Sequence, residues 1–203
     1  MVQMSCPNCG DRVETRSGVR MLTCPSCGTT LLIEDEVVKA AGQAGVMHEA
    51  PLLFGIGDRV HCPAGVFDIL GHARFSYGRG WWDEFWALDA EGHPAWLSID
   101  EGDVAVQRRL RGEAGPGGGM ALRLGDGFRF RGDDYRVTEI DLAECIALRG
   151  EFDEALSVGE TYRFINALSQ GGALLSGEFQ DGSALWFEGE WIDPFEVRTE
   201  RAA

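Results

Sequence analysis

Short runs of alternating apolar and polar residues fill most of the chain after residue 51. A period of two places successive side chains on opposite faces of a strand, so each run predicts a strand with one buried face. Turn residues separate the runs, and Ala90-Glu91-Gly92-His93 and Asp181-Gly182 predict tight hairpins. The predicted strands cover residues 59–62, 66–71, 84–88, 95–99, 104–108, 128–131, 135–140, 145–148, 162–166, 173–179 and 184–191. The pattern therefore predicts an all-β fold.

The two halves of this region resemble each other at a constant offset of 68 residues. Gly57-Asp58 aligns with Gly125-Asp126, and Phe67 aligns with Tyr135. Alternating apolar positions persist while polar ones change, as a shared buried strand face requires. We expect a duplication that gives two related small halves, each barrel-like or sandwich-like. A chance similarity between two hairpins is the alternative.

Composition suggests where these units begin and end. The predicted units are a zinc ribbon at 1–33, a linker at 34–51, a first β half at 52–110, a glycine-rich linker at 111–119 and a second β half at 120–199. The first linker is charged and then rich in Ala and Gly, and we expect at most a short helical turn near residues 36–41. The glycines between Gly115 and Gly119 predict a flexible linker or an exposed loop.

Two Cys-Pro-x-Cys-Gly turns carry the clearest chemical signal, and their cysteines are Cys6, Cys9, Cys24 and Cys27. The proline and the glycine supply the tight turn that points both sulfurs of a pair at one centre. Four thiolates complete a tetrahedron without an open position, so the spacing predicts structural Zn²⁺, with a redox dithiol or a disulfide as the alternative. A unit of about 30 residues has too little core to fold alone, so we expect it to unfold without metal. Cys62 and Cys145 lie in predicted strands, where core packing is the expected role.

Charge narrows the choice of partners. The 203 residues carry a net charge of −15, with a balance of +1 up to Ile33 and 15 basic against 31 acidic residues from Glu34 onward. This distribution disfavours nucleic acid and anionic membranes, although Arg12, Arg16 and Arg20 give the ribbon a small basic group. The sequence contains no apolar run of about 20 residues and no secretory signal pattern in residues 1–10. We therefore expect a cytoplasmic protein, either free or at the periphery of a membrane complex.

Aromatic residues cluster with carboxylates in the first half and again near the end of the second. The candidate ligand or partner surface consists of Trp82, Asp83, Glu84, Trp86, Trp96 and Trp191. Trp82, Glu84 and Trp86 would share one strand face, with Asp83 on the other. One interpretation is an aromatic groove for a peptide, a sugar or a cation held beside Asp83 and Glu84. The other, which we favour, is that the rings form the core of a glycine-rich barrel.

Catalytic motifs are missing from the sequence. The four histidines form no metal-ligand pair, and the glycine-rich segments lack the lysine of a phosphate loop. No Gly-x-Ser-x-Gly elbow is present. We therefore expect no enzymatic activity.

The region from residue 51 to residue 197 resembles the bacterial "domain of unknown function 4178" family. The segments that carry the resemblance are Gly57-Asp58, residues 82–88, residues 96–98, residues 159–163 and residues 189–194. The family has no established activity, and the genes of its members often lie beside those of polyamine-synthase-like enzymes and of membrane-stress or flotillin-like scaffold proteins. The resemblance therefore implies an accessory role in such a system. The first 33 residues resemble the generic zinc ribbons fused to many bacterial proteins.

Together these observations predict a non-enzymatic zinc-ribbon adaptor. It would mediate protein–protein contacts in a bacterial membrane-stress or polyamine-related system. The alternative is a binder of small cationic ligands such as polyamines, through an acidic surface lined by aromatic rings.

Overall fold

The computed structural model describes residues 2–34, 37–111, 115–117, 119–180 and 182–202. In these residues the chain forms sixteen strands, two 3-10 helices and no α-helix, so the predicted all-β class is confirmed. The described residues contain no helix with the length and apolar character needed to span a membrane.

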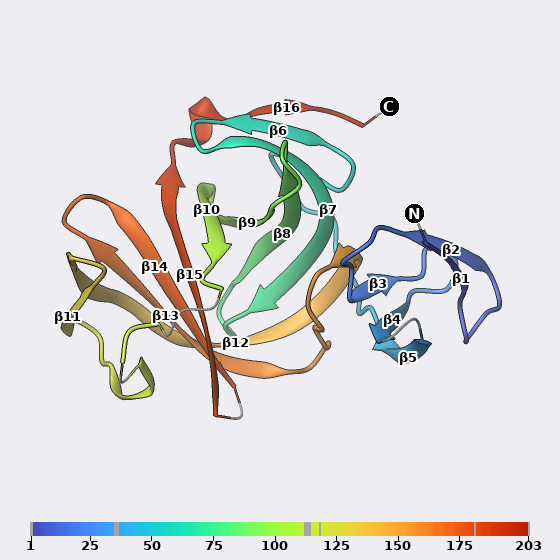
Figure 1. Ribbon diagram of the computed structural model, residues 1–203, viewed down its shortest axis with the longest axis horizontal. Helices are drawn as coiled ribbons and strands as arrows, with labels where there is room; N and C mark the ends of the chain where they lie inside the picture. The colour runs from blue at the N-terminus through green and yellow to red at the C-terminus, as the bar shows by residue number, and fades with distance from the viewer. Residues whose placement is uncertain (1, 35–36, 112–114, 118, 181, 203) are drawn as a thin grey trace.

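The N-terminal unit, which we call the ribbon, is drawn in blue in Figure 1. Its strands are β1 (Val2–Ser5), β2 (Arg12–Thr15), β3 (Met21–Thr23), β4 (Thr29–Glu34) and β5 (Val37–Gln43). β1 and β2 form a separate two-stranded sheet, whereas β3, β4 and β5 pair in that order at one end of the large sheet.

A strand occupies part of the segment that we predicted as a linker. β5 pairs antiparallel with β4, and Val38 lies opposite Ile33. The helical turn expected near residues 36–41 is wrong over 37–41, because this segment satisfies the backbone groups of β4 and because its valines favour extended backbone. Glu36 lies outside the described residues.

The rest of the chain consists of two repeats. The first repeat (residues 55–110) contains β6 (Arg59–Cys62), β7 (Gly65–Ser76), β8 (Trp81–Asp89), β9 (Pro94–Asp100) and β10 (Asp103–Arg109). The second repeat (residues 122–192) contains β11 (Gly127–Phe130), β12 (Asp133–Phe152), β13 (Thr161–Ser169), β14 (Ala173–Gln180) and β15 (Ser183–Ile192). The remaining elements are η1 (Gly119–Ala121), η2 (Pro194–Glu196) and β16 (Arg198–Glu200). The runs 135–140 and 145–148, expected to be two strands, belong to the single long strand β12.

Eight of these strands form a closed ring. The antiparallel pairs run in the order β7-β8-β9-β10-β15-β14-β13-β12, and β12 returns to pair with β7. Figure 1 shows β10 beside β15 on one side of the ring and β7 beside β12 on the other. A ring of eight strands has an interior that side chains can fill or that can hold one small ligand.

Each repeat also has its own core on the outer side of the ring. Phe67, Phe85 and Leu97 are fully buried in the core of the first repeat, and Ile165 and Leu175 in that of the second. A third cluster fills part of the ring between the repeats and continues into the ribbon. The strands of the ring therefore carry buried side chains on both faces.

The two repeats share backbone hydrogen bonds as well as sequence pattern. The Gly57 amide donates to the Ile69 carbonyl (2.9 Å), and the Ile69 amide donates to the Asp58 carbonyl (3.0 Å). The same two bonds recur 68 residues later, at Gly125, Val137 and Asp126 (both 2.9 Å). An identical bonding pattern at one offset supports a duplication over a chance similarity of two hairpins.

The offset changes from 68 to 80 partway through the repeat. Ser76 pairs with Trp81 across a loop of residues 77–80, whereas the equivalent Glu144 pairs with Thr161 across residues 145–160. We call residues 145–160 the insertion. Its first residues pair with β7, from Cys145 opposite Phe75 to Gly150 opposite Gly71. The insertion is twelve residues longer than the equivalent loop 77–80 of the first repeat, and its pairing with β7 closes the ring.

The glycine-rich segment between the repeats is partly packed, because Pro116 and Gly119 are buried whereas Gly117 is exposed. A side chain on Gly115 or Gly119 would collide with the Trp186 ring. We expected this segment to be flexible or exposed, but these two glycines allow the backbone to lie against an aromatic ring. The expected hairpin residue Asp181 and the segment 112–114 lie outside the described residues.

Candidate metal site and ligand cavity

The four ribbon cysteines lie on two turns with the same backbone bonds. The Cys6 carbonyl accepts from the Gly10 amide, and the Cys6 amide donates to the Asp11 carbonyl, both at 2.8 Å. The second turn repeats the pattern at Cys24, Gly28 and Thr29, with both bonds at 2.9 Å. Gly10 and Gly28 have φ values of +78° and +71°, which glycine adopts without strain. The sequence therefore dictates two matching knuckles that face each other.

The sulfurs have the spacing of a four-ligand metal site. All four Sγ atoms lie within 4.8 Å of one another, and the Cys6–Cys27 and Cys9–Cys24 distances are both 3.8 Å. A tetrahedron with metal–sulfur bonds of about 2.3 Å has an edge of about 3.8 Å. Hydrogen bonds with Thr29 lower the pKa of Cys27 to about 6, which favours its thiolate form. The backbone of Asp11 lowers the pKa of Cys9, but burial and the three neighbouring cysteines raise it more, to about 12. The residues thus fit a metal ion with a closed shell of four sulfur ligands.

A second candidate site is a cavity inside the ring, between the two repeats. Its volume is about 90 Å³, which is room for several water molecules. Its aromatic walls are Phe75, Tyr77, Trp82, Trp96, Tyr162, Phe164, Phe187 and Trp191. The carboxylates that face it are Glu84, Asp100, Glu139, Glu154 and Glu178. An apolar cavity with a few polar groups is the usual form of a small-molecule site.

Strand alternation explains which side chains enter the cavity. On β8, Trp82 and Glu84 face inward, while the intervening Asp83 and the next residue, Phe85, are buried on the outer face. On β14, Ser176 and Glu178 face inward in the same way. Because successive strand residues point to opposite faces, every second residue of the ring lines the interior.

Three of the carboxylates form an inner acidic group, Glu84, Glu154 and Glu178. Burial raises the pKa of Glu84 to about 7, although Trp82 Nε1 donates a 2.8 Å hydrogen bond to it. Burial and the charge of Asp153 raise the pKa of Glu154 to about 7, and Arg109, 3.7 Å away, opposes the rise. Burial and the charges of Glu84 and Glu154 raise the pKa of Glu178 well above its usual value.

The inner acidic group has little compensating positive charge. Among the described residues, the Glu178 carboxylate has neither a hydrogen-bond nor an ion-pair partner, and Arg109 is the one cation paired with the group. Carboxylates taken from water without a partner are costly, so they retain a proton or attract a cation.

A second, outer acidic group consists of Asp100 and Glu139. Burial first, and then the charge of Glu139, raise the pKa of Asp100. The Asp100 Oδ1 atom is buried without a hydrogen-bond partner in the described part of the chain. Asn166 Nδ2 donates a 2.8 Å hydrogen bond to Glu139 Oε2. Asp100 lies two residues beyond Ser98, which is paired with Glu84, so Glu84 and Asp100 are diagonal cross-strand neighbours with a backbone separation of about 7–8 Å.

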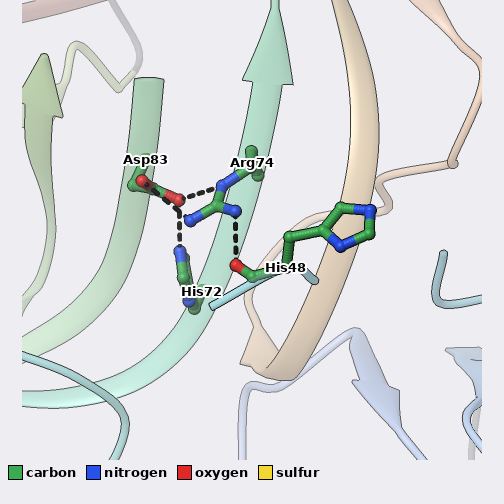
Figure 2. Close-up of polar contacts among 4 residues, drawn as sticks. All are labelled: His48, His72, Arg74 and Asp83. Atoms are coloured by element: carbon green, nitrogen blue, oxygen red, sulfur yellow. Dashed lines mark hydrogen bonds and ion pairs between the residues drawn. The ribbon is translucent and has the colours of Figure 1, made fainter. Parts of the chain in front are cut away.

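Asp83 lies in a different environment, shown in Figure 2. It accepts hydrogen bonds from Arg74 at 2.7 and 3.2 Å and lies 2.6 Å from His72 Nε2. Burial raises the pKa of Asp83, but the bonds with His72 and Arg74 lower it more, so the net shift is downward. Arg74 also donates a 2.7 Å hydrogen bond to the His48 carbonyl, which fixes the segment between the ribbon and the ring.

The predicted surface residues therefore divide into three environments. Trp82, Glu84, Trp96 and Trp191 line the cavity, and Trp191 is 42% exposed. Trp86 is buried in the cluster between the repeats. Asp83 is not beside the cavity rings, because it is paired with Arg74 on the other face of β8. The expectation that Asp83 and Glu84 together hold a cation beside the rings is therefore wrong for Asp83, which faces the other side of β8.

Sequence reasoning missed Glu154, Glu178 and Tyr162. Glu178 occupies an inward position of β14, but alternation does not say which of two buried faces encloses a cavity. Glu154 belongs to the insertion, whose extra residues appear once the two repeats are aligned beyond residue 144. An alignment that allowed a second offset could have identified it.

The fold and its two sites define a class of protein: an all-β chain with a four-cysteine ribbon joined to a closed ring of two repeats around an acidic cavity. A family model described as "Domain of unknown function (DUF4178)" matches residues 55–194, more than half of the chain, and the chain belongs to this family. The match covers both repeats and leaves out the ribbon. No curated protein and no solved structure matches the chain.

Proposed function

We propose that the chain binds a small organic cation with two or more amino groups, a linear diamine or polyamine, inside the ring. The observation that carries this proposal is the inner acidic group, three glutamates that face an aromatic-lined cavity with one arginine as their paired cation. A bound ammonium group would replace the missing positive charge and restore the ionised form of the carboxylates.

The aromatic walls favour an organic cation over a bare metal ion. Trp82 and Trp96 present rings to the cavity, and such rings attract ammonium groups and cover methylene chains. Hard metal ions prefer six or more oxygen ligands, including waters, which a cavity of about 90 Å³ lined by rings does not readily supply.

The arrangement of charge favours a ligand with two cationic ends. The inner acidic group and the outer pair Asp100 and Glu139 face one cavity, and Glu84 of the first group lies diagonally across from Asp100 of the second, with a backbone separation of about 7–8 Å. A diamine with a short methylene chain has a comparable separation between its nitrogens. A ligand with a single charge would leave one of the groups uncompensated.

For the ribbon we propose Zn²⁺ as a structural ion. Four cysteine thiolates in a closed tetrahedron are the usual ligands of structural zinc and leave no position for a substrate. Free thiols in such a site suit the reducing interior of a cell, so we propose a cytoplasmic location.

The adaptor function predicted from the sequence ranks second. Much of the aromatic surface that suggested a protein partner, including Trp82 and Trp96, faces the cavity instead of solvent. Either function is non-enzymatic in our proposal. A protein partner captured in a pulldown without any ligand binding would reverse this ranking.

Isothermal titration with putrescine tests the ligand proposal directly. We expect saturable one-site binding to the zinc-loaded full chain and none of the length-matched neutral diol 1,4-butanediol. Glu178→Gln and Glu84→Gln should each weaken binding at least tenfold. Glu144→Gln is the matched control, because Glu144 is an exposed residue of β12 and loses the same charge.

The pH dependence gives a second readout. Glu84 and Glu154 have pKa values of about 7 without ligand, so both carry protons at pH 6 and are largely ionised at pH 8. The diamine stays charged over this range, so its affinity should rise from pH 6 to pH 8. Affinity that is flat with pH, or equal losses in Glu144→Gln and Glu178→Gln, would contradict the proposal.

A further inference from the structure

The insertion of the second repeat is held by the ribbon. β3 pairs with the end of β12, with Met21 opposite Phe152 and Leu22 opposite Glu151. The Arg20 amide donates to the Phe152 carbonyl at 2.9 Å. Four residues beyond Phe152, the Leu156 amide lies 3.2 Å from the sulfur of Met21. The ribbon therefore orders the insertion at both ends of the segment 151–156.

The same segment forms a wall of the cavity. Glu154 and Leu156 line it directly, so one of the three inner carboxylates comes from the insertion. Phe152 is fully buried and stacks on the cavity residue Trp96, with ring centroids 6.0 Å apart. The position of this wall thus depends on contacts that lie outside the ring.

One continuous buried cluster joins the two sites. It includes the metal-site cysteines Cys6 and Cys24, then Met21 and Leu22 of β3, and it reaches Phe152 and Trp96. Met21 and Leu22 are 2% and 4% exposed. Packed interiors transmit displacements because they contain few voids.

A second set of contacts fastens the start of the insertion. The Leu148 amide donates to the Ala44 carbonyl at 2.8 Å, and Arg149 donates to the carbonyls of Ala44 and Gly45 at 3.0 and 3.1 Å. Ala44 follows β5 directly, and its amide donates to the Gly28 carbonyl of the second cysteine knuckle at 3.0 Å. Both sides of the insertion are thus linked to residues that the metal organises.

We infer that the metal-loaded ribbon positions the insertion, and with it Glu154, so that metal occupancy controls whether the cavity can hold its ligand. The inference rests on the proposed function for its ligand part. The two-state element is the ribbon itself, because a unit of this size folds with its metal and unfolds without it. When the ribbon unfolds, β3 no longer pairs with Glu151 and Phe152, and the wall that carries Glu154 loses its support.

Thermodynamic linkage makes the coupling reciprocal. If the metal raises the affinity for the diamine by a given factor, the diamine raises the affinity for the metal by the same factor. The ligand should therefore slow the transfer of Zn²⁺ from the ribbon to a chelator.

Hydrogen exchange of the full chain, with and without Zn²⁺, tests the coupling without any ligand. We expect loss of metal to increase exchange at least tenfold in peptides covering residues 145–160. Peptides from β8 and β9 should change far less, because each of these strands is paired along both edges with other strands of the ring. Unchanged exchange in the insertion after metal removal would overturn the inference.

Two variants separate the coupling from general unfolding. Cys24→Ser with Cys27→Ser removes two metal ligands, and Cys62→Ser is the matched control outside the ribbon. Met21→Ala keeps all four cysteines but removes the sulfur beside Leu156. We expect hydrogen exchange in the insertion to be faster than in the wild type for the double variant and for Met21→Ala. For Cys62→Ser we expect the wild-type exchange rate. A Met21→Ala protein with bound zinc and wild-type exchange in residues 151–156 would contradict the inference.

Putrescine titration of the same proteins completes the test. Metal-free and Met21→Ala proteins should bind at least tenfold more weakly than the zinc-loaded wild type. If the zinc-loaded wild type itself binds no diamine, the proposed function fails, while the exchange result still decides the coupling. Equal diamine affinity with and without zinc would overturn the coupling and leave the proposed function standing.

Discussion

The two repeats share a backbone and differ in the chemistry that they present to the cavity. At the offset of 80, Asp89 and Ser169 each accept a hydrogen bond from the amide four residues later, at 2.8 and 3.0 Å. The same offset places Glu84 of the first repeat at the position of Phe164, and Ser98 at the position of Glu178. The fold thus requires the turns and leaves the inward positions free to vary.

This difference separates acids that the repeat itself requires from acids that it does not. Asp58 and Asp126 both bond to the amide three residues earlier, at 2.8 and 2.9 Å, so an aspartate at this turn is part of the repeat. Glu84 and Glu178 have no acidic counterpart in the other repeat. Their presence is therefore not explained by the architecture, which supports a role in binding.

The largest difference between the repeats in the free energy of unfolding should follow from Asp83→Ala. Its removal leaves Arg74 buried without its carboxylate, and breaking a buried ion pair costs about 3–5 kcal/mol. At the equivalent position of the second repeat, Arg163→Ala loses a 2.8 Å hydrogen bond to the Leu122 carbonyl and should cost about 1 kcal/mol. Urea unfolding of both variants measures the two losses. Equal losses would break the distinction that we draw between these positions.

A smaller difference is expected at the shared turn aspartates. Asp58 is 5% exposed and also accepts from Arg201 and the Ala202 amide, whereas Asp126 is exposed. Asp58→Ala should lower the unfolding free energy by about 2–3 kcal/mol, and Asp126→Ala by about 1 kcal/mol or less. Chemical denaturation checks both values. A larger loss at Asp126 would show that the second repeat depends on its turn more than its exposure indicates.

The cavity carboxylates should give the folded protein an unusual pH dependence without ligand. Glu84 and Glu154 have pKa values of about 7 when folded and about 4.3 when unfolded. Between these values the folded state holds more protons, so stability should fall as the pH rises from about 4.5 to 7 and then level off. In Glu154→Gln the decrease in the free energy of unfolding over this pH range should be smaller by roughly 1 kcal/mol, a value that allows for partial screening by solvent. Thermal melts at several pH values measure this decrease. Glu144→Gln should leave it unchanged.

The smallest expected difference in stability between the repeats is that between two equivalent turn glycines when each is replaced by alanine. Gly92 and Gly172 have φ values of +83° and +87°, and no atom lies within 4 Å of a Cβ placed on either. Each substitution to alanine should therefore cost about 1 kcal/mol through backbone strain alone. Thermal melts of the two variants should agree within about 0.3 kcal/mol. A clear inequality would show that the turns are not equivalent in the folded protein.

Local sequence patterns predicted many of the strands and turns, but they could not predict which strands pair across long stretches of the chain. The strand at Arg59–Cys62, the cysteine knuckles and the shared inward face of Trp82 and Glu84 follow from alternation and turn chemistry. The pairing of Cys145 with Phe75, about 70 residues apart, has no signature in either segment. Because the ring strands are buried on both faces, the sequence also could not show which face encloses the cavity.

The pairing of β10 with β15 has a consequence for how such a cavity could arise. Gln107 lies opposite Gly189 and Arg109 opposite Phe187, so the pairing is unchanged when the two repeats exchange places. The two repeats are thus related by a local two-fold axis at this pairing. Two identical chains joined about such an axis would present every inward side chain twice, so a single new glutamate would appear as a symmetric pair. Fusion into one polypeptide removes that restriction, since each half can mutate alone. Glu84, Glu154 and Glu178 are therefore arranged asymmetrically, in a way that a homodimer of one repeat could not reproduce.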